Sequence, residues 1–254
     1  WKIATANVSD IVACGGKPSA CLSSLGVPPD FPPAVLEAIY DGLADAARHY
    51  GFDVVGGNVS AASELWIDLF MLGKAPRFIS RGGAKPGDLV VVTGAIGDAA
   101  AGFDLLQSRR RGREDPPYAE ALVNKHLRPQ ARLDLVDPLR AAASAAIDIS
   151  DGLASELHRL AERSKVQISI DAGRIPMSAE LTVFATDRQI DPLRLALSSG
   201  EEYQLVFTLP KGGNLAPFGG RGTRIIGEVR AGSGVLLDGA VLEPLGWDHL
   251  KAGP

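Results

Sequence analysis

Near the middle of this 254-residue chain, acidic and hydroxyl side chains interrupt an apolar segment. Asp148, Ser150 and Asp151 follow a short apolar run that is typical of a buried strand, and leucines at helical spacing come after Gly152. Ser150 or Asp151 could be the N-cap of that helix. Alternatively, Asp148 and Asp151 could together hold hard cations, which prefer oxygen ligands. By itself the run favours capping, because caps are a common use of Ser and Asp.

Two glycine-rich segments also follow predicted strands. Residues 54–58 (VVGGN) leave backbone N–H groups open to a ligand, and residues 93–98 (TGAIGD) precede a helix and resemble a phosphate cradle. Neither has the Walker A or GxGxxG spacing, so each alone is best interpreted as a turn. Oxygen-bearing side chains near the ends of predicted elements are Asp10, Asn58, Asp148 and Asp151. Such a set suits a site for Mg²⁺ and phosphate.

The composition excludes several classes of protein. With 46% hydrophobic residues the chain can bury a substantial core, and its net charge of -4 argues against a broad nucleic-acid surface. No apolar run approaches the roughly 20 residues that span a bilayer, and the first residues lack a signal-peptide pattern. Cys14 and Cys21 have no CxxC spacing and the four histidines are scattered, so no structural zinc is expected. We therefore expect a cytoplasmic protein that binds neither nucleic acid nor membrane.

The apolar pattern predicts a mixed α/β (α+β) chain in two parts. In the first part we expect helices over 3–14 and 33–50, and strands over 18–27, 52–57 and 65–71. In the second part we expect strands over 89–93, 145–149, 167–171, 203–208, 223–229 and 235–237, helices over 98–106 and 153–163, and further helices up to about residue 143. Residues 80–88, rich in Gly, Lys and Pro, are typical of a boundary. The expected domains are 1–80 and 81–254.

An ordered series of motifs resembles one known family. The motifs are NVSD at 7–10, GG at 15–16, VGGN at 55–58, RGGAKPGD at 81–88, TG at 93–94, GD at 97–98, HLRP at 126–129, DISDG at 148–152, GEEY at 200–203 and GWDH at 246–249. In this order, over nearly the whole chain, they are similar to the thiamine-monophosphate kinases of the aminoimidazole ribonucleotide synthetase superfamily. The set is far more specific than any one motif.

The resemblance implies both a fold and an activity. It implies an N-terminal sheet domain that pairs with its copy in a homodimer, a C-terminal α/β domain, and a cleft between them for ATP and several Mg²⁺ ions. The predicted strand 65–71 agrees, because Trp66 and Phe70 make its second face apolar as well. The implied reaction converts thiamine monophosphate and ATP to thiamine diphosphate and ADP. The acceptor is already an anionic phosphate, so no side-chain base is expected.

The resemblance also assigns roles to single residues. The implied metal ligands are Asp10, Asn58, Asp148 and Asp151. The implied nucleotide-binding residues are Tyr40, Gly57, Asn58, Arg81 and Ser150. The implied acceptor-binding residues are Glu201 and Trp247, and the Trp247 ring suits packing against the thiamine rings. Packing in the core stays open for Tyr40 and Trp247, whereas for Asp148 and Asp151 metal binding becomes the favoured interpretation.

Three positions depart from the family's usual pattern. Asn58 and Glu202 stand where Asp is usual, and Ser199 stands where Gly is usual. The family's upstream segment, with further acidic ligands and a histidine, does not precede Trp1, and we expect the protein to begin upstream of this residue. Two other functions stay open: another ATP-using enzyme of the same superfamily, and a truncated nucleotide-binding protein without catalysis.

Overall fold

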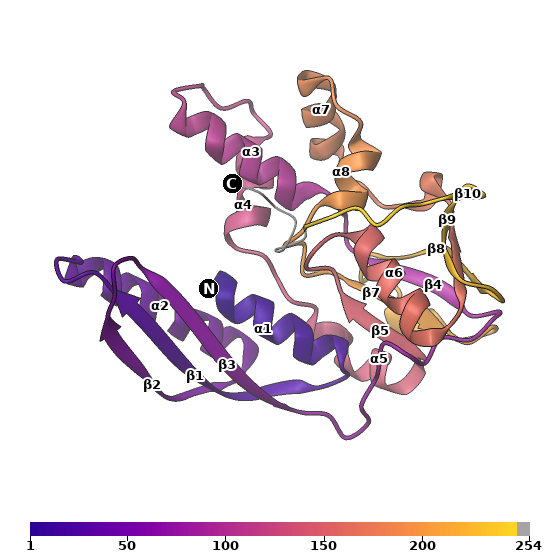
Figure 1. Ribbon diagram of the computed structural model, residues 1–254, viewed down its shortest axis with the longest axis horizontal. Helices are drawn as coiled ribbons and strands as arrows, with labels where there is room; N and C mark the ends of the chain where they lie inside the picture. Colours follow the sequence, from indigo (N-terminus) through magenta and orange to yellow (C-terminus); the bar gives the residue numbers. More distant parts are fainter. Residues whose placement is uncertain (248–254) are drawn as a thin grey trace.

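The computed structural model describes residues 1–247, which form two sheets with helices around them (Figure 1). Elements of the N-terminal part are α1 (Lys2–Ala13), β1 (Lys17–Val27), α2 (Pro33–Tyr50), β2 (Asp53–Ala61) and β3 (Trp66–Lys74). Elements of the C-terminal part are β4 (Leu89–Thr93), α3 (Asp98–Arg110), α4 (Ala119–Leu127), α5 (Val136–Ala142), β5 (Ala145–Asp148), α6 (Leu153–Ser164), β6 (Gln167–Ile170), α7 (Ala179–Arg188), α8 (Pro192–Ser198), β7 (Leu205–Leu209), β8 (Thr223–Arg230), β9 (Gly234–Leu237) and β10 (Ala240–Val241). The last two residues of the GWDH motif lie outside the described residues.

The N-terminal sheet has the strand order β2-β1-β3 and two unlike faces. Cys21 and Leu69 on one face belong to a buried cluster with Val8 of α1 and Leu43 of α2. Figure 1 shows both helices on this side of the sheet. The opposite face is open, and its exposed apolar side chains are Leu22, Trp66, Phe70 and Leu72. Both faces of β3 are thus apolar, as expected. Within the described residues, no other part of the chain covers one of these faces.

The C-terminal sheet has seven strands in the order β10-β9-β6-β8-β4-β7-β5. Successive residues of a strand point to opposite faces. Accordingly, Val90 and Val92 of β4 pack in one cluster with α6, whereas Val91 packs in the other. This second cluster also contains Val8 and Val12 of α1. A continuous hydrophobic core therefore joins the two parts of the chain and holds α1 against β5.

The predicted elements are found, with several differences at their ends. The strand expected over 52–57 continues to Ala61, so VGGN lies inside β2 and does not form a loop after it. The elements α7, α8 and β10 were not predicted, although both helices begin with clear signals in the sequence. Ser178 caps α7, and Asp191 caps α8 just before Pro192. Among residues 1–247, no helix has the length and apolar character that crossing a membrane requires.

Candidate active site between α1 and the C-terminal sheet

Two carboxyl groups meet where α1 ends beside β5. The Asp10 carboxyl is hydrogen-bonded to that of Asp148. Asp148 is buried, and this burial, reinforced by the negative charge of Asp10, raises its pKa. Asp10 is exposed to solvent on one side. Desolvation of its other side raises its pKa, and the positive charge of Arg81 opposes this rise. The helix and the strand thus bring together two acids that lie 138 positions apart in the sequence.

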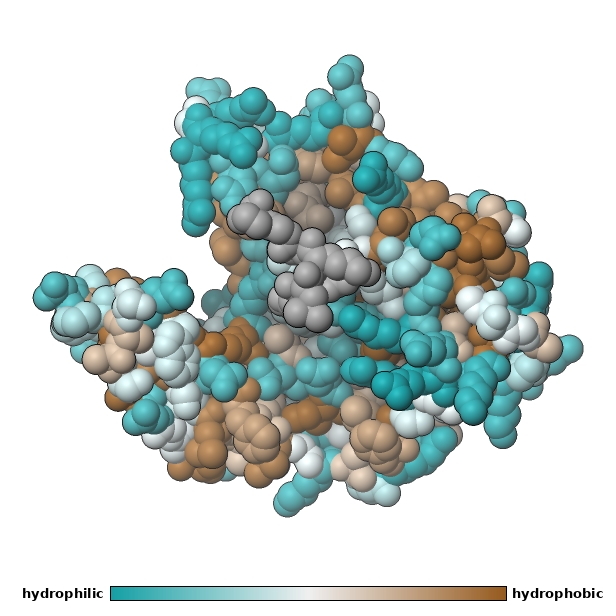
Figure 2. All heavy atoms as spheres, in the orientation of Figure 1, coloured by the Kyte–Doolittle hydropathy of each residue, from teal (hydrophilic) through white to brown (hydrophobic). Residues whose placement is uncertain are grey.

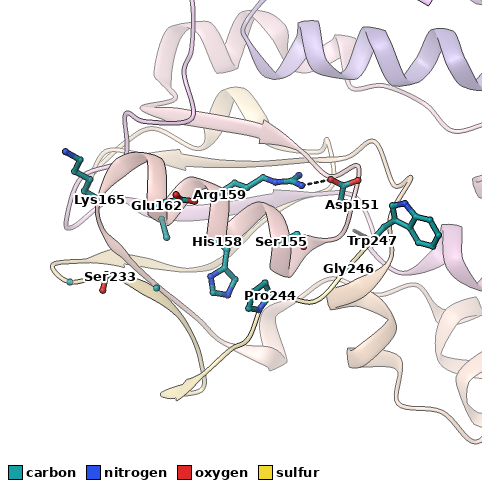
Figure 3. Close-up of a pocket in the computed structure, with 13 residues that line it drawn as sticks. Asp151, Ser155, His158, Arg159, Glu162, Lys165, Ser233, Pro244, Gly246 and Trp247 are labelled. Atoms are coloured by element: carbon teal, nitrogen blue, oxygen red, sulfur yellow. Dashed lines mark hydrogen bonds and ion pairs between the residues drawn. The ribbon is translucent and has the colours of Figure 1, made fainter. Parts of the chain in front are cut away.

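Asp151 adds a third acid to this cluster. The α6 helix has Gly152 as its N-cap without a side-chain cap, so the capping interpretation of Ser150 and Asp151 is wrong. Instead, Asp151 Oδ2 accepts a hydrogen bond from Arg159 Nη2 at 2.6 Å, marked in Figure 3. Arg159 also donates to the buried Glu156 at 2.7 Å. The charge of Asp151 contributes to raising the pKa of Asp10, so the three acids act on a common region.

All three acids line one cleft of about 850 Å³. The surface is hollowed between the N-terminal sheet and the helices of the C-terminal part in Figure 2. Carboxylate oxygens are the ligands that Mg²⁺ prefers, and a divalent cation in the cleft would compensate the negative charge that the three acids bring together there. Within residues 1–247, no group of three or more acidic, histidine or cysteine side chains already has metal-binding geometry. The donor chemistry therefore fits a metal, and ligation requires the side chains to rearrange.

Glu201 lies in the same cleft as the acids and binds two cationic or titratable partners. Its carboxylate forms an ion pair with Lys2 Nζ at 2.8 Å and lies 3.6 Å from His126 Nδ1. Partial burial and the Lys2 charge lower the pKa of His126. The rings of His126 and Phe103 have centroids 5.2 Å apart, and both line the cleft. Glu201 thus connects α1 to the helical wall of the cleft.

The chain turns sharply before Trp247, at the mouth of the cleft. Gly246 has φ +137°, and a Cβ there would lie 2.3 Å from the Asp151 carbonyl oxygen, so the position requires glycine. The Trp247 N–H donates to the same carbonyl at 2.9 Å. The Trp247 residue is 56% exposed and therefore does not close the core. It lines both the cleft and a neighbouring cavity of about 1150 Å³ along α6, which Figure 3 shows.

The predicted nucleotide-binding residues are found in two places. Ser150 lines the cleft, and the charge of Arg81 is near enough to Asp10 to oppose the rise in its pKa. Tyr40 packs against the N-terminal core from α2 and does not line the cleft. In this single chain, therefore, Tyr40 is separated from the acids that it was expected to accompany.

Gly57 and Asn58 also lie away from the cleft, on β2. Gly57 pairs with Ser23, and a Cβ at residue 57 would lie 1.9 Å from the Ser23 carbonyl oxygen, so strand pairing alone accounts for this glycine. Asn58 pairs with Ser24, and directly paired residues point to the same face of a sheet. Ser24 alternates with the buried Ser23 and Leu25, which places Asn58 on the open apolar face.

Two residues of the site were not predicted from the sequence: Lys2, which pairs with the cleft residue Glu201, and Phe103, which lines the cleft. Lys2 carried no motif, and its role depends on the packing of α1 beside Glu201. Phe103 is an apolar residue of a helix, and such residues are usually assigned to the core, but it is 49% exposed and faces the cleft. His126 is part of the HLRP motif, to which no functional role was assigned, and it also lines the cleft.

Comparison with known proteins agrees with this fold. Residues 1–75 match the family described as AIR synthase related protein, N-terminal domain, and residues 85–238 match its C-terminal domain. The thiamine-monophosphate kinase of Aquifex aeolicus (strain VF5) is 41% identical over 249 residues, which are 98% of this chain and 80% of that protein. The corresponding protein of Pyrococcus horikoshii is 41% identical over 256 residues, with shares of 99% and 79%.

Solved structures give the same result. The structure of AaThiL complexed with AMPPCP and TMP matches with a TM-score of 0.92 and 40% identity, covering 98% of this chain and 80% of that one. HypE of E. coli, a hydrogenase maturation protein, matches with a TM-score of 0.76 at 20% identity over 98% of this chain and 81% of that one, which shows a shared fold alone. The chain belongs to the AIR synthase related family and, within it, to the thiamine-monophosphate kinases.

Proposed function

We propose that this chain transfers the terminal phosphoryl group of ATP to thiamine monophosphate, giving thiamine diphosphate and ADP. The carrying observation is that three acids, Asp10, Asp148 and Asp151, line the same cleft as Glu201 and Trp247. The chemistry brings two polyanions together, which requires metal ions and positioned donors more than a base. Membership of the thiamine-monophosphate kinases and the AMPPCP and TMP bound to a 40%-identical relative support this reaction.

Asp10, Asp148 and Asp151 are our proposed holders of Mg²⁺. When bound, Mg²⁺ supplies positive charge that neutralises phosphate oxygens. To bind a cation, Asp10 and Asp148 must give up the hydrogen bond between their carboxyl groups, and Asp151 must share or leave its ion pair with Arg159. Ser150 and Arg81 lie next to these acids, and we assign them to the nucleotide.

The acceptor occupies the part of the cleft that carries Glu201 and the aromatic side chains. Thiamine has a cationic thiazolium ring, and a carboxylate and an aromatic face both attract such a ring. Trp247 and Phe103 supply exposed ring faces, while Glu201 supplies the negative charge. The Lys2 ammonium group beside Glu201 is placed to attract the acceptor phosphate. No residue has to remove a proton, because the attacking phosphate oxygen is already anionic.

The proposed assembly is a homodimer through the open face of the N-terminal sheet. This face exposes Leu22, Phe70 and Leu72, and a contiguous apolar patch of this kind is typical of an interface. Asn58 lies on the same face, so it would contribute to a metal site only through the dimer. We place the reaction in the cytoplasm, the compartment that supplies ATP.

An acceptor panel tests the proposed reaction. The full-length protein is incubated with ATP, Mg²⁺ and either thiamine monophosphate, thiamine, aminoimidazole-type ribonucleotides or selenide, and the products are identified by mass spectrometry. Thiamine diphosphate is expected with thiamine monophosphate alone. Turnover with another acceptor, or ATP binding without turnover of any acceptor, would favour the two functions that the sequence left open.

A further inference from the structure

Helix α3 begins without a cap from its own sequence. Its N-cap is Gly97, with φ +104°, which offers no side chain. The first N–H groups of a helix lack partners within the helix and need acceptors from elsewhere. Glu202 Oε1 accepts from the N–H groups of Gly97 and Ala99 at 2.8 and 3.1 Å, and Ser199 Oγ accepts from that of Ala100 at 3.2 Å. Two side chains of the loop before β7 therefore cap α3 from outside.

The two capping side chains also bind each other. Ser199 Oγ donates a hydrogen bond to Glu202 Oε1 at 2.6 Å. Both residues are buried, with exposed fractions of 2% and 6%. Burial raises the pKa of Glu202 to about 7.

The backbone on both sides of Glu202 adopts conformations that L-amino acids avoid. Glu201 has φ +60° and Tyr203 has φ +49°. Such residues persist where surrounding contacts hold them in place. The contacts here are the external cap on one side and two backbone hydrogen bonds on the other. Glu201 N–H donates to the Ser150 carbonyl at 2.7 Å, and Tyr203 N–H donates to that of Ile149 at 2.9 Å.

The 199–203 loop is consequently bonded to two walls of the cleft at once. One wall is α3, which carries Phe103, and the other is the 148–151 segment with its two acids. Gly200 permits this close approach, because a Cβ there would lie 2.7 Å from the Ser150 carbonyl oxygen. Between these attachments, the Glu201 side chain extends to Lys2.

We propose that Ser199 and Glu202 are positioning residues, whose external cap on α3 fixes Glu201 and the Phe103 wall relative to the acidic segment 148–151. The proposal rests on the proposed function in one respect, the contact between Glu201 and the acceptor. Without the cap, the first N–H groups of α3 lose their acceptors. The strain at Glu201 and Tyr203 is then opposed only by the two backbone hydrogen bonds to Ser150 and Ile149, so Glu201 leaves its place beside Lys2.

Paired variants of the full-length protein test this role. Glu202→Ala removes the acceptor, whereas Glu202→Gln keeps an Oε1 that can accept all three hydrogen bonds. Glu202→Ala should raise the KM for thiamine monophosphate at least about tenfold, because a buried donor without an acceptor carries the full desolvation cost. It should change the KM for ATP by less than about threefold. Glu202→Gln should stay within about twofold of wild type in both constants. Ser199→Ala should lie between them, and combining it with Glu202→Ala should add little, because the two residues share one network.

Amide hydrogen exchange gives a readout that does not depend on turnover. In Glu202→Ala, exchange should accelerate at residues 97–101 and 200–204 and stay unchanged in β6 and β8. Thr208→Val is the matched control, since Thr208 is a buried hydrogen-bonded residue near the other end of β7. It should lower the melting temperature without shifting the KM for thiamine monophosphate.

The outcomes separate this proposal from the proposed function. Unchanged exchange at residues 97–101 in Glu202→Ala would overturn the external cap. If Glu202→Ala raises the KM values for thiamine monophosphate and ATP equally, Ser199 and Glu202 are general stabilisers. The same conclusion follows if the Thr208→Val control lowers the melting temperature and also raises the KM for thiamine monophosphate. If the wild-type protein does not phosphorylate thiamine monophosphate, the proposed function fails, and the exchange data still decide whether the cap orders the loop.

Discussion

Replacing Trp247 by alanine should weaken acceptor binding and leave ATP binding nearly unchanged. Trp247 lies at the mouth of the cleft, anchored by its backbone to the Asp151 carbonyl rather than by burial of its ring. The anchoring segment is held in turn by Ser155 and His158 of α6, which bind the Leu245 and Leu242 carbonyl oxygens at 2.8 and 2.7 Å. The variant therefore loses a ring face without losing the course of the backbone.

The size of the effect follows from the exposed area of the ring. Trp247 is 56% exposed, and of the roughly 250 Å² that a tryptophan offers this leaves about 140 Å² available. A thiamine ring stacked on one face would cover about half of it, and about 70 Å² at about 25 cal/mol per Å² is about 1.7 kcal/mol. The KM for thiamine monophosphate should therefore rise between about 10- and 20-fold.

Steady-state kinetics with each substrate varied in turn measure the two constants. Trp247→Phe is the control, because it keeps an aromatic face and should recover most of the affinity. Thermal unfolding should change little, since a largely exposed side chain leaves no cavity behind. If both KM values rise together, or if neither moves, Trp247 does not bind the acceptor and the reasoning from its exposed ring fails.

Three further predictions concern the acids, the open sheet face and the buried Glu202. Asp151→Asn should lower turnover at limiting Mg²⁺ at least about tenfold, because a charge is lost from the proposed metal site. The melting temperature should change only slightly, because Asn still offers an oxygen to Arg159 and position 151 is not a helix cap. Wild-type turnover in a Mg²⁺ titration would remove Asp151 from the metal site. Phe70→Glu, at a side chain that is 62% exposed on the open face, should convert the proposed dimer to a monomer in sedimentation at micromolar concentration, and a monomeric wild type would contradict the proposed interface. Burial raises the pKa of Glu202 from 4.5 to about 7, so the folded state holds this proton more tightly than the unfolded state and loses stability as the pH rises through that window. The free energy of unfolding, measured with urea at pH 5 and pH 8, should therefore decrease less between these pH values in Glu202→Gln than in wild type. Equal decreases would show that Glu202 is not the group responsible.

The residues that the sequence predicted correctly are those whose position follows from local pattern. The DISDG run ends a strand and precedes a helix as expected, because apolar alternation and leucine spacing are local signals. The meeting of Asp10 with Asp148 depends on α1 packing against β5, a long-range contact that no local pattern indicates. The N-cap role predicted for Ser150 or Asp151 was wrong, because Gly152 takes that position and Asp151 binds Arg159 instead.

Other parts of the site depend on register and on long-range contacts. Asn58 was expected in a loop, but β2 runs on past it, and pairing with Ser24 determines the face on which it lies. No local pattern indicates a strand's register, so its distance from the cleft was not foreseeable. Glu202 was recorded as a departure from the family, yet its role as a cap appears only when α3 and the 199–203 loop are seen together. Lys2 is a similar case, since its partner Glu201 lies 199 positions away.

The most direct test of the proposed reaction is the transfer of label from ATP carrying a radioactive terminal phosphate. With full-length protein, Mg²⁺ and thiamine monophosphate, the label should appear in thiamine diphosphate in equal amount to the ADP formed. Asp148→Asn should abolish this transfer, because it removes a buried acid from the proposed metal site. Release of the label as free phosphate by the wild type, or equal transfer by wild type and Asp148→Asn, would contradict phosphoryl transfer at this cleft.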